Sequence, residues 1–313
     1  MDAILIGEML IDFTPGDAPY SYIANPGGAP ANVAVSMSRN GLDVGFLGKL
    51  GNDDFGHRLV STLTENRIQV LCPNLTNQAT TTLAFVTLYE NGERSFTFAR
   101  KPGADLLLDI NDVDDQKIAE SHLLHAGSLS LSAEPSRSAV IHAMMTAHEQ
   151  QKLVSFDINY RDAVWSKESA KMAVGVVYDY VDLLKISDEE LFFVGGEAGI
   201  PAFMNEHHIT VLIETLGAKG SRYYLRAADG SVTSATVDGC KVDAVDATGA
   251  GDAFWGGFLS WLLLHEIHTA AAITENDLTA ALQYGNCSGA LCVQQSGGIP
   301  AIPTRNEIEE FMK

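Results

Sequence analysis

A short string of small and acidic residues, TGAGD at 248–252, stands directly before an uncharged run at 254–264. The run predicts a helix that is buried on all sides. The first N–H groups of a helix have no partner within it and carry about half a positive charge. Because Gly249, Ala250 and Gly251 lack bulky side chains, these N–H groups are open to an anion. Asp252, in the first turn, can accept a proton.

This combination suits phosphoryl transfer, which needs positioning, charge stabilisation and a base for the attacking hydroxyl. We therefore predict that Asp252 is the base and that the backbone at 249–251 holds the transferring phosphoryl group. The alternative is that Asp252 merely caps the helix. Two other phosphate motifs fit poorly. The chain has no GxxxxGK[ST], and Phe254 stands where a GxGxxG fingerprint needs its third small residue.

The rest of the chain alternates between strand and helix patterns. Strands are predicted at 3–13, 43–51, 122–128, 153–159, 181–187 and 209–217, with a hairpin at 222–237. Helices are predicted within 27–41, 53–67, 135–151 and 168–178 and near the C-terminus, with a short one at 188–195. The alternation predicts an α/β fold whose mostly parallel sheet is covered by helices on both faces.

Residues 81–100 break this rhythm, because they alternate with period two around Asn91-Gly92, a strong hairpin signal. A strand pair that stands off the main sheet would form a flap over a cleft or an oligomer contact. The alternative is an antiparallel extension at the edge of the main sheet. We expect one compact domain, 1–313, with this appendage.

Composition excludes several classes of partner. The 313 residues include 40 acidic and 20 basic ones, a net charge of −20, which argues against nucleic-acid binding. The four cysteines form no CxxC pair and predict reduced thiols in a cytosolic protein. The N-terminus lacks the basic region of a signal peptide, and no apolar run reaches the ~18 residues that span a membrane. We expect a cytoplasmic protein.

Two separate signatures carry a family resemblance. Residues 246–258, DATGAGDAFWGGF, resemble the C-terminal signature of the ribokinase-like (PfkB) carbohydrate kinases, and 25–41 together with 46–56 resemble the N-terminal one. The resemblance covers essentially the whole chain. It implies a three-layer αβα ribokinase-like fold with a small β-strand lid at about 13–25 and 81–100. It also implies an ATP-dependent sugar kinase that forms a homodimer through the lid.

The resemblance assigns the sugar and phosphoryl contacts residue by residue. Asp252 is again the base, with the anion hole at 249–251. Sugar hydroxyls would be held by Asp12, Gly27, Gly28 and Asn32. Without the family pattern, a loop cap would be the favoured interpretation of Asp12, and a plain turn that of the two glycines.

The resemblance also implies nucleotide and cation contacts. Thr215, Gly217 and Gly220 match the family's GxxG segment, which is otherwise an ordinary turn. Asn286 matches a position in the adenine pocket, or is simply solvated. Glu190 would organise Mg²⁺ and phosphates through water, although Ser187 replaces the usual Asn, and Lys185 is assigned to the same nucleotide side. A potassium site would use Asp246, Thr248, Val293 and Gly298, with Ala301 where a Ser often ligates.

The choice of sugar depends on two further segments. Residues 93–105 resemble fructokinases, and 157–165 resemble both fructokinases and 2-keto-3-deoxygluconate kinases. Phe98, Arg100 and Arg161 would then face the sugar, although both arginines could instead form surface ion pairs. We predict a fructokinase. A keto-deoxy-acid kinase remains open because Arg100 could meet a substrate carboxylate, and a riboside kinase remains open too. A non-catalytic binder would have no need of Asp252, and an oxidoreductase lacks its fingerprint.

Overall fold

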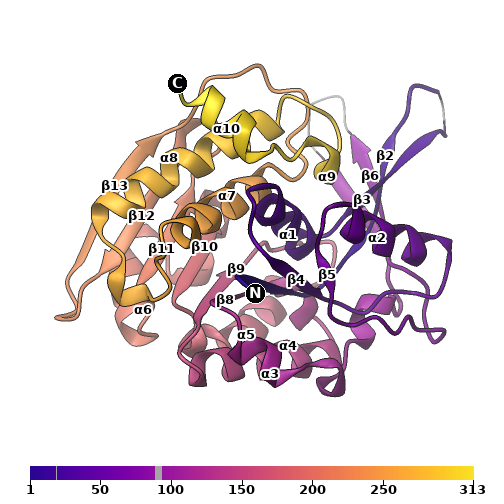
Figure 1. The fold of residues 1–313 in the computed structure, drawn as a ribbon, viewed down its shortest axis with the longest axis horizontal. Helices are drawn as coiled ribbons and strands as arrows, with labels where there is room; N and C mark the ends of the chain where they lie inside the picture. Colours follow the sequence, from indigo (N-terminus) through magenta and orange to yellow (C-terminus); the bar gives the residue numbers. More distant parts are fainter. Residues whose placement is uncertain (19, 89–93) are drawn as a thin grey trace.

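The computed structural model describes residues 1–18, 20–88 and 94–313, and its main feature is a nine-stranded sheet (Figure 1). Its strands, in spatial order, are β13 (Val232–Asp238), β12 (Gly220–Arg226), β11 (Val211–Thr215), β10 (Leu183–Ser187), β9 (Leu153–Asp157), β8 (Leu123–Gly127), β1 (Ala3–Ile6), β4 (Val44–Leu47) and β5 (Gln69–Val70). The strands from β11 to β5 pair in parallel, and β12 and β13 add an antiparallel hairpin. The predicted mostly parallel sheet is confirmed.

Helices cover both faces of this sheet (Figure 1). Along β1, Leu5 belongs to one apolar core and its neighbours Ile4 and Ile6 to another, because successive strand side chains point to opposite faces. The first core packs against α1 (Ala29–Arg39), α2 (Asp54–Glu65), α7 (Ala250–Leu264) and α8 (Glu275–Cys292). The second packs against α3 (Asp115–Ala119), α4 (Ser136–Glu149), α5 (Lys167–Gly175) and α6 (Ile200–Glu206). The three-layer αβα architecture is therefore confirmed.

Short elements complete the chain. α9 (Gly298–Ala301) and α10 (Arg305–Phe311) follow α8. Residues 188–195, predicted as a short helix, contain the 3₁₀ helix Asp188–Val194. The remaining 3₁₀ turns are Ala104–Leu107, Ile110–Asp112, Ser128–Leu131, Tyr178–Tyr180, Glu197–Gly199, Gly217–Lys219 and Ala270–Ala272.

Helix α7 is buried from residue 253 to 260 and at Leu262 and Leu263, as the uncharged run at 254–264 predicts, and Trp261 and Leu264 are partly exposed. Its glycines let it lie close to two neighbouring helices: a Cβ on Gly256 would stand 2.4 Å from Ser36 Cβ on α1, and one on Gly257 would stand 2.9 Å from Ser288 Cβ on α8. This tight packing fixes the start of α7, and with it Asp252, against α1.

The first predicted strand, 3–13, is wrong as a single element. β1 ends at Ile6, Gly7 adopts a φ of 145°, and β2 (Leu10–Pro15) belongs to a different sheet. A Cβ on Gly7 would lie 2.8 Å from Pro30 Cγ, so glycine is needed where the chain leaves the main sheet.

A second, four-stranded sheet stands beside the main one (Figure 1). Its order is β3 (Tyr22–Gly27), β2, β6 (Leu83–Leu88), β7 (Arg94–Ala99); β3 and β7 each run antiparallel to their neighbour, and β2 and β6 are parallel. The predicted β-strand lid is confirmed, and the alternative of an edge extension of the main sheet is wrong. The predicted turn at Asn91-Gly92 lies outside the described residues.

Candidate active site

A cavity of about 170 Å³ brings together strands of the four-stranded sheet, segments that follow β1, β8 and β9 of the main sheet, and two helix starts. Many of the predicted site residues line it, although they come from distant parts of the sequence. The lining residues are Glu8, Leu10, Asp12, Gly28, Ala29, Asn32, Phe98, Leu129, Asn159, Arg161, Ala247, Thr248, Gly249 and Asp252.

The start of α7 opens onto this cavity. Gly249 is the N-cap residue, with a φ of 76°, and no side chain caps the helix. Among the described residues, the N–H groups of Gly251 and Asp252 donate no hydrogen bond to another backbone group. Within the predicted anion hole at 249–251 the Ala250 N–H already donates to the Ala247 carbonyl over 3.3 Å, so the open donors are those of Gly251 and Asp252, and simple helix capping by Asp252 does not describe this site.

Asp252 is held by a residue from another helix. Asn32 Nδ2 on α1 donates to Asp252 Oδ2 over 2.7 Å. Burial raises the pKa of the Asp252 carboxyl above its ordinary value, and the hydrogen bond from Asn32 opposes this shift. Asn32 Oδ1 is buried without a hydrogen-bond partner among the described atoms, so it is available to a ligand hydroxyl.

A buried ion pair stands next to the anion hole. Lys185 Nζ donates to Asp157 Oδ2 over 2.8 Å, and a Cβ on Gly251 would lie 3.7 Å from Nζ. Burial alone would lower the pKa of Lys185, but the carboxylates of Asp157 and Glu190 outweigh it and raise the pKa. Lys185 therefore stays charged beside the open N–H groups. Sequence reasoning assigned Asp157 no role, although it is the first residue of the segment 157–165 that carries the family resemblance.

Glu190 lies on the same side but is tied to the backbone. Its two carboxylate oxygens accept the N–H groups of Ser187 (2.8 Å) and Tyr160 (2.6 Å). Burial raises its pKa, and the charge on Asp157 adds to that rise. The carboxylate fixes the loop after β9 against the turn after β10.

On the predicted sugar side, the glycine pair makes room for two other groups. A Cβ on Gly27 would lie 2.1 Å from Asp12 Oδ2, and one on Gly28 would lie 2.6 Å from the Glu8 carbonyl oxygen. Burial raises the pKa of Asp12 to about 7, the charge of Asp252 adds to this, and Arg161 opposes it. Asp12 lies on the lid strand β2, so the lid contributes a cavity wall.

Two polar residues of the cavity lining, Glu8 and Asn159, were missed from the sequence. Glu8 is buried, accepts the Ser130 hydroxyl over 3.0 Å, and has its pKa raised to about 7 by burial. Its signal was a charge inside an apolar run. Asn159 has a φ of 39°, which non-glycine residues seldom adopt. It lies two residues before Arg161 in the segment that carried the fructokinase resemblance.

The prediction that Arg100 faces the sugar is wrong, because its side chain does not line the cavity. Its guanidinium forms a buried ion pair with Asp105 (Nε to Oδ2, 2.8 Å) and donates to Ser132 Oγ and the Leu129 carbonyl. The surface ion pair considered as the alternative is equally wrong, since this pair is buried. Arg100 stands behind the cavity wall, next to Leu129.

The residues predicted to contact the nucleotide lie outside the lining of this cavity. Thr215 ends β11, and Gly217, with a φ of 58°, begins the exposed 3₁₀ turn that follows. Gly220 is required by packing, since a Cβ there would lie 2.2 Å from the Val237 carbonyl oxygen. Asn286 is buried rather than solvated, and its amide donates to the carbonyls of Val237 and Asp238 over 3.2 Å.

The predicted potassium ligands lie around the loop before α7. Asp246 accepts hydrogen bonds from the Thr248 N–H and hydroxyl and from the Gly297 N–H. A Cβ on Gly249 would lie 3.2 Å from Gly298 Cα, which places Gly298 at the anion hole. The Val293 carbonyl already accepts the N–H groups of Val245 and Asp246, so it braces the loop and has no unused lone pair.

The described residues show neither a cluster of three or more His, Cys, Asp and Glu side chains arranged for a metal ion nor a helix long and apolar enough to cross a bilayer.

Fold and site together define a kinase that acts on a small polar molecule. The family model described as "pfkB family carbohydrate kinase" matches residues 3–305 of this chain. The chain belongs to this family. It is 42% identical to a probable fructokinase-4 of Arabidopsis thaliana, over 99% of this chain and 96% of that protein.

Two solved structures have closely similar folds. The Vibrio cholerae fructokinase with fructose, ADP and calcium bound has a TM-score of 0.86 and 34% identity, over 100% of this chain and 99% of that one. The Salmonella enterica aminoimidazole riboside kinase, complexed with its riboside and an ATP analog, has a TM-score of 0.85 and 28% identity, over 100% of both chains.

Proposed function

We propose that this protein is a fructokinase, which transfers the γ-phosphoryl group of ATP to a primary hydroxyl of fructose. The observation that carries the proposal is the contact between Asn32 and Asp252 at the open start of α7. It places a carboxylate and free backbone donors together in a cavity lined by hydrogen-bonding groups. The relatives that bind or are named for fructose support the same substrate.

Each part of the site has one role in the reaction. Asp252 accepts the proton of the attacking hydroxyl, and the open N–H groups of Gly251 and Asp252 stabilise the charge on the transferring phosphoryl group. Lys185 adds a fixed positive charge beside them. Asp12, Gly28, Asn32 and Arg161 orient the sugar so that one hydroxyl lies against Asp252.

The charges of the cavity favour a neutral sugar over a keto-deoxy acid. Among the described lining residues, three carry carboxyl groups, Glu8, Asp12 and Asp252, and one, Arg161, is basic. Even with the pKa values of Glu8 and Asp12 raised to about 7, the lining has no excess of positive charge for a substrate carboxylate. Arg100, which would have received a substrate carboxylate, is already paired with Asp105. A riboside is also neutral, so it is the competing substrate that the assay must include.

Mg²⁺ belongs to the proposal as the partner of ATP, and when bound it neutralises charge on the β- and γ-phosphates. Asp157 Oδ1 is buried and lacks a hydrogen-bond partner among the described atoms, and such an oxygen suits Mg²⁺ or its waters. The oxygens of Asp246 and Thr248 would likewise hold K⁺ beside the anion hole. Replacing K⁺ by Na⁺ should lower turnover if they do.

The proposal includes a cytoplasmic homodimer whose contact is the lid. All four cysteines are free, which suits a reducing compartment. Strand β3 forms one edge of the lid sheet and exposes Tyr22 and Ile23. An exposed apolar edge strand invites pairing with a second copy. Light scattering of Ile23→Lys against the unmodified protein tests this contact.

The deciding experiment measures ADP release from Mg-ATP with fructose, 2-keto-3-deoxygluconate, ribose and aminoimidazole riboside. Fructose should give a kcat/KM well above the other three. A preference for the keto acid would contradict the charge argument, and a preference for the riboside would keep the mechanism and change the substrate. Failure to release ADP with any of them, while ATP still binds, would contradict the fructokinase proposal.

A further inference from the structure

Two cysteine thiols that are 47 residues apart in the chain touch each other. The Sγ atoms of Cys240 and Cys287 are 3.1 Å apart, and both cysteines are free. Cys240 follows β13, and Cys287 lies in α8. A disulfide bond is about 2.05 Å long, so the sulfurs need to approach by only about 1 Å.

Contacts that do not involve sulfur hold the two thiols in place. Asn286, next to Cys287, donates to the carbonyls of Val237 and Asp238. Gly239, next to Cys240, donates its N–H to the Lys219 carbonyl over 3.2 Å. The backbone beside both cysteines is therefore fixed, and the thiols remain neighbours whatever their oxidation state.

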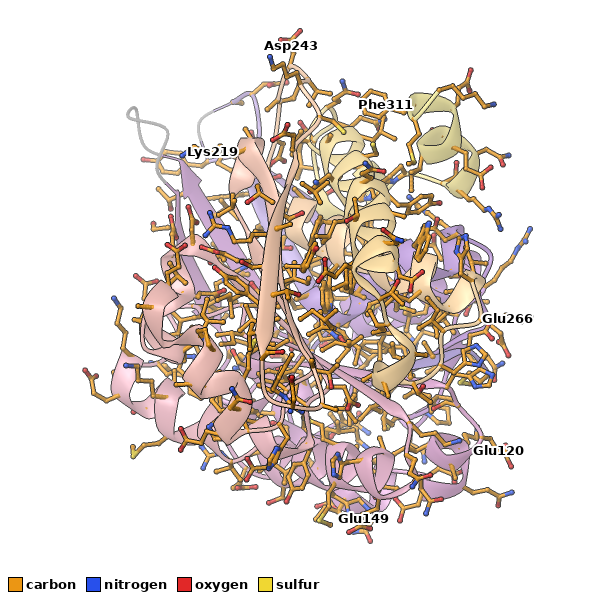
Figure 2. The ribbon with its side chains drawn as sticks, turned by 90° about the vertical axis from the view of Figure 1, so that its left-hand side faces the viewer. Glu120, Glu149, Lys219, Asp243, Glu266 and Phe311 are labelled. Atoms are coloured by element: carbon orange, nitrogen blue, oxygen red, sulfur yellow. The ribbon has the colours of Figure 1, made fainter. Side chains whose placement is uncertain are left out.

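The two thiols differ in access. Cys240 is partly exposed and begins a mostly exposed segment that ends at α7; Figure 2 shows Asp243 of this segment projecting outward from the molecule. Cys287 is buried, and burial followed by its contact with Cys240 raises its pKa to about 12. An oxidant therefore reaches Cys240 first, and Cys287 completes the reaction by proximity.

We propose that Cys240 and Cys287 are an oxidation site. A low-molecular-weight disulfide, such as oxidised glutathione, oxidises the two thiols to an intramolecular disulfide bond. The Cys240 thiolate attacks one sulfur of the small disulfide, which forms a mixed disulfide and releases one thiol. The Cys287 sulfur then attacks Cys240 Sγ, and its proton passes to the departing thiolate, which leaves as the second thiol. The protein dithiol is oxidised, and the small disulfide is reduced to two thiols.

The bond would close a covalent loop around the catalytic segment. Residues 240–287 contain the open start of α7, all of α7 and much of α8. A cross-link across so long a loop restricts the unfolded chain and stabilises the fold. Neither cysteine lines the cavity, so the sugar site itself is unchanged.

The test incubates the whole protein with oxidised glutathione in mildly alkaline buffer. We expect the loss of two hydrogens by intact mass, a 240–287 cross-link by peptide mapping, and a Tm raised by several degrees and restored by dithiothreitol. The double variant Cys72→Ser/Cys292→Ser keeps the other two thiols and should behave like the unmodified protein.

Cys240→Ser should lose the cross-link and the rise in Tm, and because this residue is partly exposed the variant is expected to fold. A lasting glutathione adduct without ring closure would overturn the proposal. So would a cross-link that involves Cys72 or Cys292, or an oxidised protein that is no more stable than the reduced one.

Discussion

The starts of α7 and α8 are built from similar residues but are closed in opposite ways. Each has an aspartate at the third helical position, Asp252 in α7 and Asp277 in α8. At α8, Thr274 and Asp277 form a reciprocal capping box, in which each side chain accepts the other's backbone N–H. At α7 the cap is Gly249, and the aspartate instead accepts from Asn32 on another helix.

The difference shows that the cap residue, rather than the acid alone, decides whether a helix start is closed or left open. Thr274 uses the carboxylate of Asp277 to satisfy the backbone of α8. Gly249 has no side chain to offer, so the N–H groups of Gly251 and Asp252 stay open and the carboxylate of Asp252 bonds to a different helix. α10 repeats the closed form with Thr304 and Glu307.

Replacing the aspartate gives the largest expected effect. Asp252→Asn should lower kcat by at least ~10²-fold, since it removes the base, with little change in the KM values for fructose and ATP. The matched variant Asp277→Asn should leave kcat unchanged. Steady-state kinetics of both variants checks this, and equal turnover of Asp252→Asn and the unmodified protein would remove the base from the mechanism.

A methyl group added at the open start of α7 should lower activity without lowering stability. Gly251→Ala places its Cβ 3.7 Å from Lys185 Nζ, inside the anion hole. We expect kcat/KM for ATP to fall on the order of 10-fold, because one donor is screened. The Tm should not fall, because Ala favours a helix over Gly by roughly 0.5–1 kcal/mol. Asn276→Ala, at the same position of α8, should not change kinetics; a loss of activity there would contradict the comparison.

The hydrogen bond that replaces the capping box should appear in the pH profile. The Asn32 amide lowers the pKa of Asp252, against the effect of burial. The base must be ionised, so turnover falls as pH decreases through that pKa. Asn32→Ala should therefore move the acid limb of kcat to higher pH. Ser38→Ala, on the same helix and bonded to the Asn66 carbonyl, is the control. An unmoved acid limb would mean that Asn32 does not tune the base.

A mutation in the capping box at the start of α8 should change the stability of the protein and leave its activity unchanged. Thr274→Ala removes one half of the capping box and should lower the free energy of unfolding by about 1 kcal/mol. Chemical denaturation measures this loss, and kcat should stay constant. A drop in turnover would show that α8 is coupled to the site.

The sequence predicted features that have a local cause. The uncharged run fixed α7 as a buried helix, and period-two alternation separated the lid from the main sheet. The break of the predicted strand 3–13 at Gly7 was not predicted, because a glycine in an apolar run does not indicate which sheet each half of the run joins.

The errors concern side chains whose partners come from other elements. Arg100 belonged to a segment with a clear family pattern, yet the direction of its guanidinium depends on Asp105 and Ser132. Asp157 and Glu8 are buried carboxylates whose use is set by Lys185 and Ser130. Such partners are visible only after the strands are arranged in space.

The position of Asp12 on lid strand β2 has a consequence for selectivity. If fructose binds as proposed, the residue that recognises the sugar belongs to the part that covers it. A sugar with a misplaced hydroxyl would then lose its hydrogen bond to Asp12, and the closed position of the lid would lose the same stabilisation. Discrimination between sugars and protection of ATP from water would therefore be one property of the enzyme, and a mutation that loosens one should loosen the other.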